Sequence, residues 1–195
     1  MRLFIAFDID AEIRQRIGRF LEGVGGFAPD ARWVPLESVH ITLKFIGEQP
    51  PEIVPTLQSQ LKNVTAPHFD LAFGGFGFFP TPKSPRVFWI GIKAGPELQS
   101  LAAAIDDATA TLGIPKEDRA FTPHLTLARK SGASGTPRRQ KNDRPNQAFQ
   151  RLQEKLATLP ALDFGTMTAR EFFLYQSQLS RTGSHYTRLH GFPLS

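Results

Sequence analysis

Two short stretches of the sequence decide the fold that we predict: His40-Ile41-Thr42-Leu43 and, in the second half of the chain, His124-Leu125-Thr126-Leu127. Each stretch alternates polar and aliphatic side chains, which is typical of a β-strand with one face against a core. Side chains two residues apart on a strand point to the same face, so each stretch presents one imidazole and one hydroxyl together. Two copies of this pattern, one in each half of the chain, indicate a duplicated fold.

The segments around the two stretches repeat one order of elements. Hydrophobic periodicity and turn residues predict a strand at 3–9 and then, in the first half, a helix from the N-cap Asp10 to Gly25-Gly26, a strand at 39–46, a helix at 51–64, and strands at 69–78 and 86–92. The second half repeats this order with a helix at 96–112, a strand at 123–128, a helix at 146–159, and strands at 166–175 and 185–190. We therefore expect an α+β fold and a single domain, residues 1–195, made of two duplicated lobes with approximate bounds 1–94 and 95–195.

Composition narrows the chemistry that this chain can perform. The 195 residues include no cysteine, which excludes disulfides, thiolate catalysis and thiolate zinc sites. No apolar run approaches the ~20 residues that span a bilayer, and the N-terminus lacks the apolar stretch of a secretory signal. We expect a soluble, cytoplasmic protein that does not associate with membranes.

The net charge of +5 is concentrated in one stretch. Residues 129–144 contain six basic side chains and one acidic one, which accounts for the whole net charge. Such a stretch suits a phosphate-bearing partner. The alternative interpretation is a solvated loop, because this stretch also contains glycine and proline.

Two opposed histidines suit general acid–base phosphoryl transfer. One neutral imidazole can deprotonate an attacking water while one imidazolium protonates the leaving oxygen, and both forms exist near pH ~6.5. Thr42 and Thr126 can each donate a hydrogen bond to a non-bridging phosphate oxygen. The histidines could instead bind a metal, but the sequence has no HExxH motif and no carboxylate at ligand spacing beside either histidine. We therefore predict a site without a metal.

At these motifs the sequence resembles the 2H phosphoesterase superfamily, and more narrowly the bacterial and archaeal RNA 2′,3′-cyclic phosphodiesterases (LigT or ThpR proteins, once named 2′-5′ RNA ligases). The resemblance covers essentially the whole chain. Besides the two motifs, the matching stretches are residues 2–8, 33–35, 44–48, 86–91, 121–123, 128–129, 173–177 and 186–189.

This resemblance implies a two-lobed fold in which helices flank antiparallel sheets and the two motifs face each other in a central cleft. It also implies metal-independent hydrolysis of RNA 2′,3′-cyclic phosphate ends, or of cyclic nucleotides, to 2′-phosphomonoesters, without a cofactor. By this analogy His40 is the proton donor and His124 the proton acceptor, while Thr42 and Thr126 hold the phosphate. We expect a monomer.

Two further residues are candidates for contact with the substrate. Arg129 lies five residues after His124, so an ideal strand would place it on the opposite face, and it reaches the cleft only if the strand ends or bulges. Phe45 has the same offset from His40, so it either stacks on a base or packs in the core, and core packing is the favoured interpretation. The roles of Trp33 and Tyr186 stay open, and the remaining histidines are interpreted as ordinary strand or loop residues: His68, His185 and His190.

Two alternative functions remain. The same acid and base can catalyse the reverse reaction, which is the ATP-independent joining of RNA ends through a 2′-5′ linkage. The other alternative is a nucleotide-binding module that has lost catalysis, although all four motif residues are present. The basic stretch at 130–144 is a departure from the family, and it leaves the length of the RNA substrate undetermined.

Overall fold

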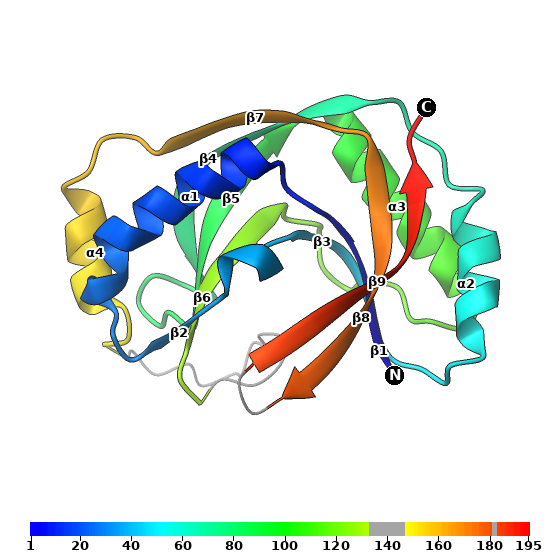
Figure 1. Cartoon of the computed structure of the whole chain (residues 1–195), viewed down its shortest axis with the longest axis horizontal. Coiled ribbons are helices and arrows are strands. Elements are labelled where there is room, and N and C mark those ends of the chain that lie inside the picture. Colours follow the sequence, from blue (N-terminus) through cyan, green and yellow to red (C-terminus); the bar gives the residue numbers. More distant parts are fainter. Residues whose placement is uncertain (133–146, 181–182) are drawn as a thin grey trace.

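One antiparallel sheet runs through the molecule (Figure 1), which is a computed structural model that describes residues 1–132, 147–180 and 183–195. Within this described part the sheet has nine strands: β1 (Arg2–Phe7), β2 (Ala31–Trp33), β3 (Ile41–Glu48), β4 (Phe69–Phe79), β5 (Val87–Ala94), β6 (His124–Lys130), β7 (Asp163–Ala169), β8 (Glu171–Ser180) and β9 (Gly183–Pro193). Their order is β7-β4-β5-β6-β3-β1-β8-β9, and the short β2 pairs with β6. The α+β class and the antiparallel pairing are confirmed.

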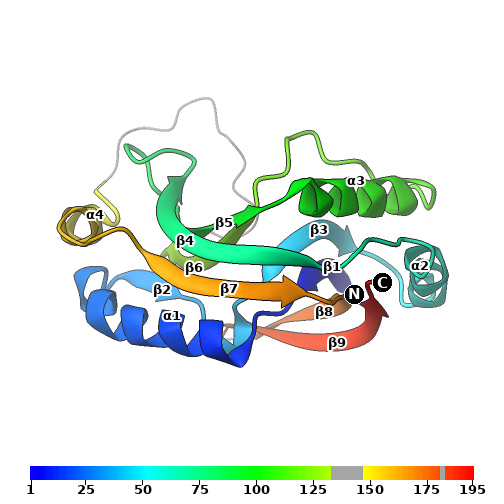
Figure 2. The ribbon, with the colours of Figure 1, turned by 90° about the horizontal axis from the view of Figure 1, so that it is seen from above.

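Helices lie at both ends of this sheet. Figures 1 and 2 place α1 (Ala11–Val24) and α4 (Gln150–Ala157) at one end, and α2 (Ile53–Leu61) and α3 (Pro96–Ala110) at the other. The first helix follows Asp10 as predicted, although the Asp10 side chain makes no capping hydrogen bond. Two 3-10 turns, η1 (Gly25–Phe27) and η2 (Leu36–Ser38), flank β2. No helix in the described ranges is both long and apolar enough to cross a bilayer.

The two faces of the sheet have different environments. In β1, Leu3, Ile5 and Phe7 are buried in the main core together with the apolar faces of the helices. The alternate residues Phe4 and Ala6 belong to a separate, smaller cluster on the other face. We call that second face the inner face. It carries the functional site described below.

Strands from the two halves of the sequence are interleaved in the sheet. The strands β8 and β9 come from the second half, yet β8 pairs with β1 and extends the sheet beyond it. The strands β4 and β5 come from the first half, yet they lie between β7 and β6. The duplicated lobes with approximate bounds 1–94 and 95–195 therefore stay a prediction, and the sheet itself runs across both halves.

Two element predictions also need correction. The expected strand at 166–175 is two strands, β7 and β8, which Arg170 separates. The short β2 was not expected, because three residues carry too little periodicity to be recognised. Most of the basic stretch lies outside the described residues, which omit 133–146.

Candidate active site

The two motif strands are neighbours in the sheet, and they meet at the motifs themselves. The antiparallel pair of β3 and β6 joins Ile41 to Leu125. Both side chains are fully buried in the main core. The residues on either side of each therefore project from the inner face, and the antiparallel register places His40 toward Thr126 and His124 toward Thr42. The structure thus brings the four predicted motif residues together.

Both imidazoles are held by the same local hydrogen bond. His40 Nδ1 lies 2.8 Å from the carbonyl oxygen of Ser38, and His124 Nδ1 lies 2.7 Å from that of Thr122. A carbonyl oxygen only accepts, so Nδ1 is the donor in each ring and Nε2 is the unprotonated nitrogen of the neutral form. Each Nε2 lies on the side of its ring away from this backbone contact. The two motifs thus present equivalent nitrogens from adjacent strands.

A β-bulge follows the threonine of each motif. In β3 the register against β1 shifts between Thr42 and Lys44, and in β6 the register against β5 shifts between Thr126 and Ala128. One extra residue in a strand reverses the facing of the residues that follow it. Arg129 therefore projects from the inner face, which was the condition for it to reach the cleft.

The same shift places Phe45 on the inner face. Phe45 pairs with Phe4 across β3 and β1, their ring centroids are 6.5 Å apart, and its side chain is 43% exposed. The favoured interpretation of Phe45 as a core residue is therefore wrong. The residue that turns to the core side instead is Lys44, which is 2% exposed.

Burial and neighbouring charges lower the proton affinity of both histidines. Burial lowers the pKa of His40 to about 4, the Asp8 carboxylate opposes this change, and the charges of Arg129 and His124 add to it. Burial also lowers the pKa of His124, and Arg129 contributes in the same direction. Arg129 therefore lies close enough to act on both imidazoles. Both rings are predominantly neutral at pH 7 in the free protein.

Aromatic side chains enclose each imidazole. The Phe4 and Tyr186 ring centroids lie 4.8 and 5.1 Å from that of His40. Beside His124, Phe79 and Trp89 lie at 5.0 and 6.2 Å. These rings account for the burial that lowers the pKa of each histidine.

The indole of Trp89 is itself tightly packed. It lies so close to the backbone of Gly77 that a Cβ atom there would be 2.1 Å from the ring, so only glycine fits. Its Nε1 is buried and has no hydrogen-bond partner among the described residues. The aromatic wall beside His124 therefore packs against β4 through Trp89.

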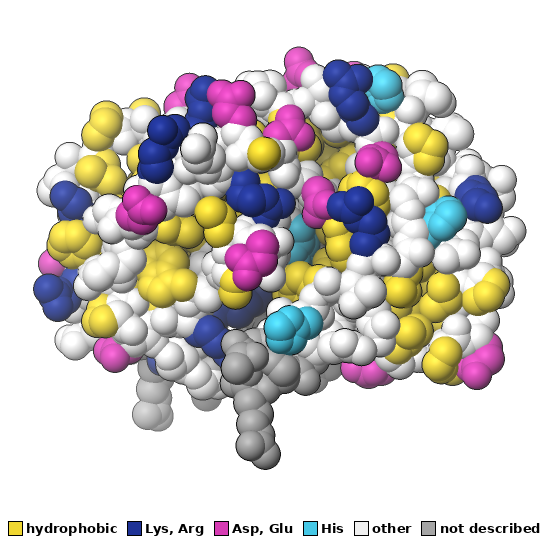
Figure 3. All heavy atoms as spheres, in the orientation of Figure 1, with side chains coloured by type: hydrophobic (Ala, Val, Ile, Leu, Met, Phe, Trp, Pro, Cys, Tyr) yellow, Lys and Arg dark blue, Asp and Glu magenta, His cyan; other side chains and the backbone are white. Residues whose placement is uncertain are grey.

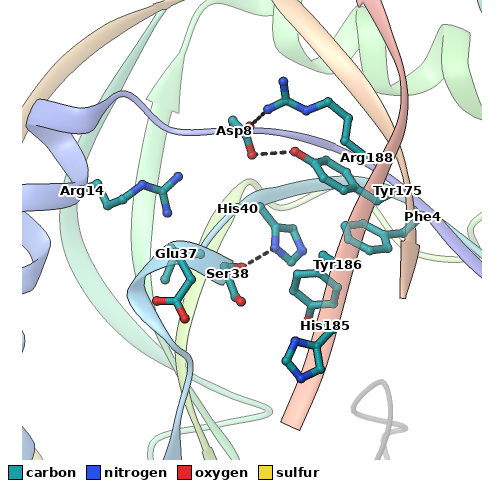
Figure 4. A pocket seen from close by; sticks show the side chains of 11 residues that line it. Phe4, Asp8, Arg14, Glu37, Ser38, His40, Tyr175, His185, Tyr186 and Arg188 are labelled. Carbon is teal, nitrogen blue, oxygen red and sulfur yellow. Dashed lines mark hydrogen bonds and ion pairs between the residues drawn. The ribbon is translucent and has the colours of Figure 1, made fainter. Parts of the chain in front are cut away.

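A cavity of about 360 Å³ opens beside His40 (Figure 4). One end of its wall is a polar network in which Asp8 accepts a 2.7 Å hydrogen bond from the Tyr175 hydroxyl and forms an ion pair with Arg188. Burial and the hydrogen bond to Asp8 raise the pKa of Tyr175 to about 12, so its hydroxyl stays protonated. The wall also includes Tyr186. Figure 3 shows a hollow near the middle of one face, with charged and histidine side chains around it.

Several residues of this cavity were not found from the sequence. Phe4, Asp8, Tyr175 and Arg188 lie within the stretches that carry the family resemblance, but no spacing distinguishes them there. His185 also lines the cavity, so reading it as an ordinary strand residue was incomplete.

Three other residues considered from the sequence contact the backbone or the core and do not line this cavity: Trp33, His68 and His190. The Nε1 of Trp33 donates a hydrogen bond to the carbonyl oxygen of Ala28, and the indole packs on the main core. His68 Nε2 lies 3.0 Å from the carbonyl oxygen of Leu194, and His190 packs against Phe192. In the described ranges no group of three or more histidine, aspartate or glutamate side chains gathers as a metal site.

Comparison with known proteins agrees with this geometry. Residues 9–176 match the 2′-5′ RNA ligase superfamily. The chain is 35% identical to an RNA 2′,3′-cyclic phosphodiesterase of Archaeoglobus fulgidus, over 98% of this chain and 99% of that protein. It is 33% identical to one of Geobacillus stearothermophilus, over 98% of this chain and 56% of that protein. The crystal structure of E. coli LigT complexed with 3′-AMP superposes with a TM-score of 0.77 at 28% identity, covering 100% of this chain and 98% of that one. The chain therefore belongs to the 2′-5′ RNA ligase superfamily.

Proposed function

We propose that this protein hydrolyses 2′,3′-cyclic phosphate ends of RNA to 2′-phosphomonoesters by metal-independent general acid–base catalysis. The observation that carries the proposal is the pairing of the two motif strands at Ile41 and Leu125, which places two histidines and two threonines on one face. Both Nδ1 atoms are occupied by backbone carbonyls, so the two Nε2 atoms are the acid and base groups. The relatives named above as RNA 2′,3′-cyclic phosphodiesterases support this substrate class.

In the proposed reaction, Nε2 of neutral His124 accepts a proton from water as the water oxygen attacks phosphorus. The bond from phosphorus to O3′ breaks on the opposite side, and protonated His40 donates its Nε2 proton to O3′. The products are a 2′-phosphomonoester and a free 3′-hydroxyl. Exchange with solvent then returns both rings to their starting protonation states.

The remaining side chains of the inner face stabilise the phosphate. The hydroxyls of Thr42 and Thr126 donate to the non-bridging oxygens, and the guanidinium of Arg129 offsets their charge. His40 needs a proton, although burial lowers its pKa in the free protein. The bound phosphodiester anion favours the charged imidazole, so the substrate itself raises the pKa of His40.

The test is incubation with a short RNA that ends in a 2′,3′-cyclic phosphate, in excess EDTA, followed by chromatography of the products. We expect a 2′-phosphate. A 3′-phosphate would reverse the orientation of the substrate, and turnover only with added metal would contradict the acid–base mechanism.

Substitution of either histidine tests its assigned role. We expect His40→Ala and His124→Ala each to lower kcat by ~10²–10⁴-fold, because each removes one proton-transfer group. His190→Ala is the matched control, since His190 packs on Phe192 outside the site, and it should retain activity. Full activity in either motif variant would exclude that histidine from catalysis.

A further inference from the structure

The two motif strands share a single backbone pair in the described part of the chain. Ile41 of β3 pairs with Leu125 of β6, and the two strands do not pair beyond it. The ladder between β6 and β5 begins at His124 itself. Thr122, whose carbonyl oxygen accepts the hydrogen bond from His124 Nδ1, therefore lies outside the ladder. Its position depends on what holds the segment that leads into β6.

That segment has little packing of its own. Every residue from 115 to 120 is exposed, and none of them is a large apolar residue. The Asp106 carboxylate of α3 holds the segment, since each of its oxygens lies 3.3 Å from the backbone nitrogen of Glu117. Lys116 adds an exposed ion pair with Asp107. Asp106 is thus a point at which the segment is joined to the helix.

Lys44 joins the same segment to the first motif strand, beside which α3 lies (Figure 2). Its Nζ donates a 2.6 Å hydrogen bond to the carbonyl oxygen of Pro115 and forms an ion pair with Asp106. The same Nζ lies 3.9 Å from a carboxylate oxygen of Glu117. The Lys44 side chain is only 1% exposed, so these contacts are shielded from water. One buried ammonium group thus connects β3, α3 and the segment that leads to Thr122.

A buried ion pair is an inefficient way to stabilise a fold. Desolvation of the two charges offsets most of their attraction, and an apolar pair of similar size is often as stable. What the ammonium group adds is direction, because its three N–H donors are satisfied only when several acceptors converge on them. Lys44 is not among the causes of the pKa shift of either motif histidine. Any effect of Lys44 on the histidines therefore passes through the backbone.

We propose that Lys44 is a positioning residue for the second motif. Together with Asp106 it fixes the segment 115–117 against β3, and thereby fixes the Thr122 carbonyl that orients the His124 imidazole. The hydrogen bond from Nδ1 to Thr122 leaves Nε2 of the neutral ring unprotonated. The catalytic consequence rests on the proposed function, in which this Nε2 accepts the proton of the attacking water.

The first motif does not need this connection. The Ser38 carbonyl that holds His40 Nδ1 belongs to η2, which precedes Ile41 in the chain, whereas Lys44 follows Ile41. Loss of Lys44 should therefore affect the two imidazoles unequally. This inequality distinguishes positioning of the second motif from general loosening of the fold.

The first test reads the orientation of His124 and needs no turnover. Nitrogen-15 NMR of the histidine rings at neutral pH distinguishes the tautomer protonated at Nδ1 from the tautomer protonated at Nε2. In Lys44→Met we expect the Nε2-protonated tautomer of His124 to increase, because the Thr122 acceptor is no longer held in place. His40 is the internal control and should keep its tautomer. Unchanged tautomers of both rings, or equal changes in both, would overturn the proposal.

The double variant Lys44→Met/Asp106→Leu separates positioning from stability. An apolar pair leaves no buried charge without a partner, so stability should recover in part. The carbonyl of Pro115 and the N–H of Glu117 still lose their partners, so we expect the tautomer change of His124 to persist. We also expect kcat with a cyclic nucleotide to fall by about ten-fold, as part of the ~10²–10⁴-fold that a general base contributes, with KM nearly unchanged. Recovery of kcat together with stability would show that Lys44 is only structural.

Two control variants complete the experiment. Lys116→Met breaks the exposed ion pair of the same segment and should change neither kcat nor the tautomer of His124. Leu152→Ala creates a cavity under α4, at the opposite end of the sheet, so it should lower stability while kcat is retained. A loss of kcat in Leu152→Ala as large as that in the double variant would mean that activity follows stability, which would overturn the proposal. If the unmodified protein does not hydrolyse cyclic phosphates, the proposed function fails, and the tautomer measurement still decides the role of Lys44.

Discussion

At the scale of single residues, three charged neighbours make the two motif histidines unequal. Asp8 raises the pKa of His40, whereas Arg129 and His124 lower it. Arg129 also lowers the pKa of His124, and no carboxylate is among the causes of its shift. A neighbouring anion stabilises the protonated imidazole, so Asp8 offsets part of the effect of burial, which still lowers the pKa of His40 to about 4.

The lowered pKa values predict an acidic optimum. The active form has a neutral His124 and a protonated His40, so activity falls at both low and high pH. Both values in the free protein lie below the usual value of 6.5. We therefore expect a bell-shaped profile of kcat/KM with its maximum below pH ~6.5, measured with a cyclic nucleotide. A flat profile or an alkaline maximum would contradict the acid–base pair.

Substitution of Asp8 should move one side of this profile. Asp8→Asn removes the negative charge that raises the pKa of His40, so fewer molecules carry a protonated His40 near neutral pH and the limb set by His40 should shift to lower pH. We expect kcat/KM at pH 7 to fall by about three- to ten-fold. Glu37→Gln is the matched control, because Glu37 is an exposed carboxylate on the same cavity that does not contribute to the pKa shift of His40. An equal shift in both variants would refute a specific role for Asp8.

At the scale of elements, the two bulges determine which side chains reach the inner face. The bulge in β6 brings Arg129 there, and the bulge in β3 brings Phe45 there. The β3 bulge also directs the Lys44 side chain to the face of the sheet that the helices cover. Lys44 Nζ donates a 2.6 Å hydrogen bond to the carbonyl oxygen of Pro115 and forms an ion pair with Asp106 on α3. This contact ties the first motif strand to the segment that leads into the second.

Loss of Lys44 should therefore destabilise the fold. Lys44→Met leaves Asp106 without its buried partner, and we expect the free energy of unfolding to fall by about 3 kcal/mol in urea titration. The double variant Lys44→Met/Asp106→Leu should recover part of this loss. The control is Lys116→Met, which breaks an exposed ion pair with Asp107 and should change nothing measurable. Equal stability of all variants would exclude Lys44 as an anchor.

At the scale of the whole molecule, strand exchange between the two halves holds the site together. The motif strand β3 lies between β1 of the first half and β6 of the second half, and β6 lies between β3 and β5, which both come from the first half. The two histidines therefore sit on one continuous hydrogen-bonded sheet rather than on lobes joined by a linker. Their relative position is fixed by the sheet and needs no closure of domains.

The basic stretch should affect long RNA only. Its central part, 133–146, lies outside the described residues, so this prediction rests on its charge alone. We expect replacement of Arg138, Arg139, Lys141 and Arg144 by glutamine to weaken the salt dependence of binding to a long RNA. The slope of the logarithm of the binding constant against the logarithm of the salt concentration should become shallower by up to about 3. Binding of a dinucleotide should not change. An unchanged slope would support the solvated-loop interpretation.

The sequence by itself determined the elements and the chemical groups of this protein. Alternation around His40 and His124 predicted both motif strands, and helical periodicity predicted the four helices. These patterns are local, because burial on one face of a strand or helix repeats with the period of its own backbone. The pairing of His-x-Thr in two equivalent strands was visible for the same reason.

Only the tertiary structure decided which residues surround those groups. Asp8 directly follows β1, whereas Tyr175 and Arg188 are partners on β8 and β9 near the other end of the sequence, so no spacing connects Asp8 with them before the sheet forms. The facing of Phe45 and Arg129 depends on bulges, which arise from pairing between strands and leave no signature in either strand alone. The interleaving of the halves follows from which sheet edges pair, and that is a property of the assembled sheet.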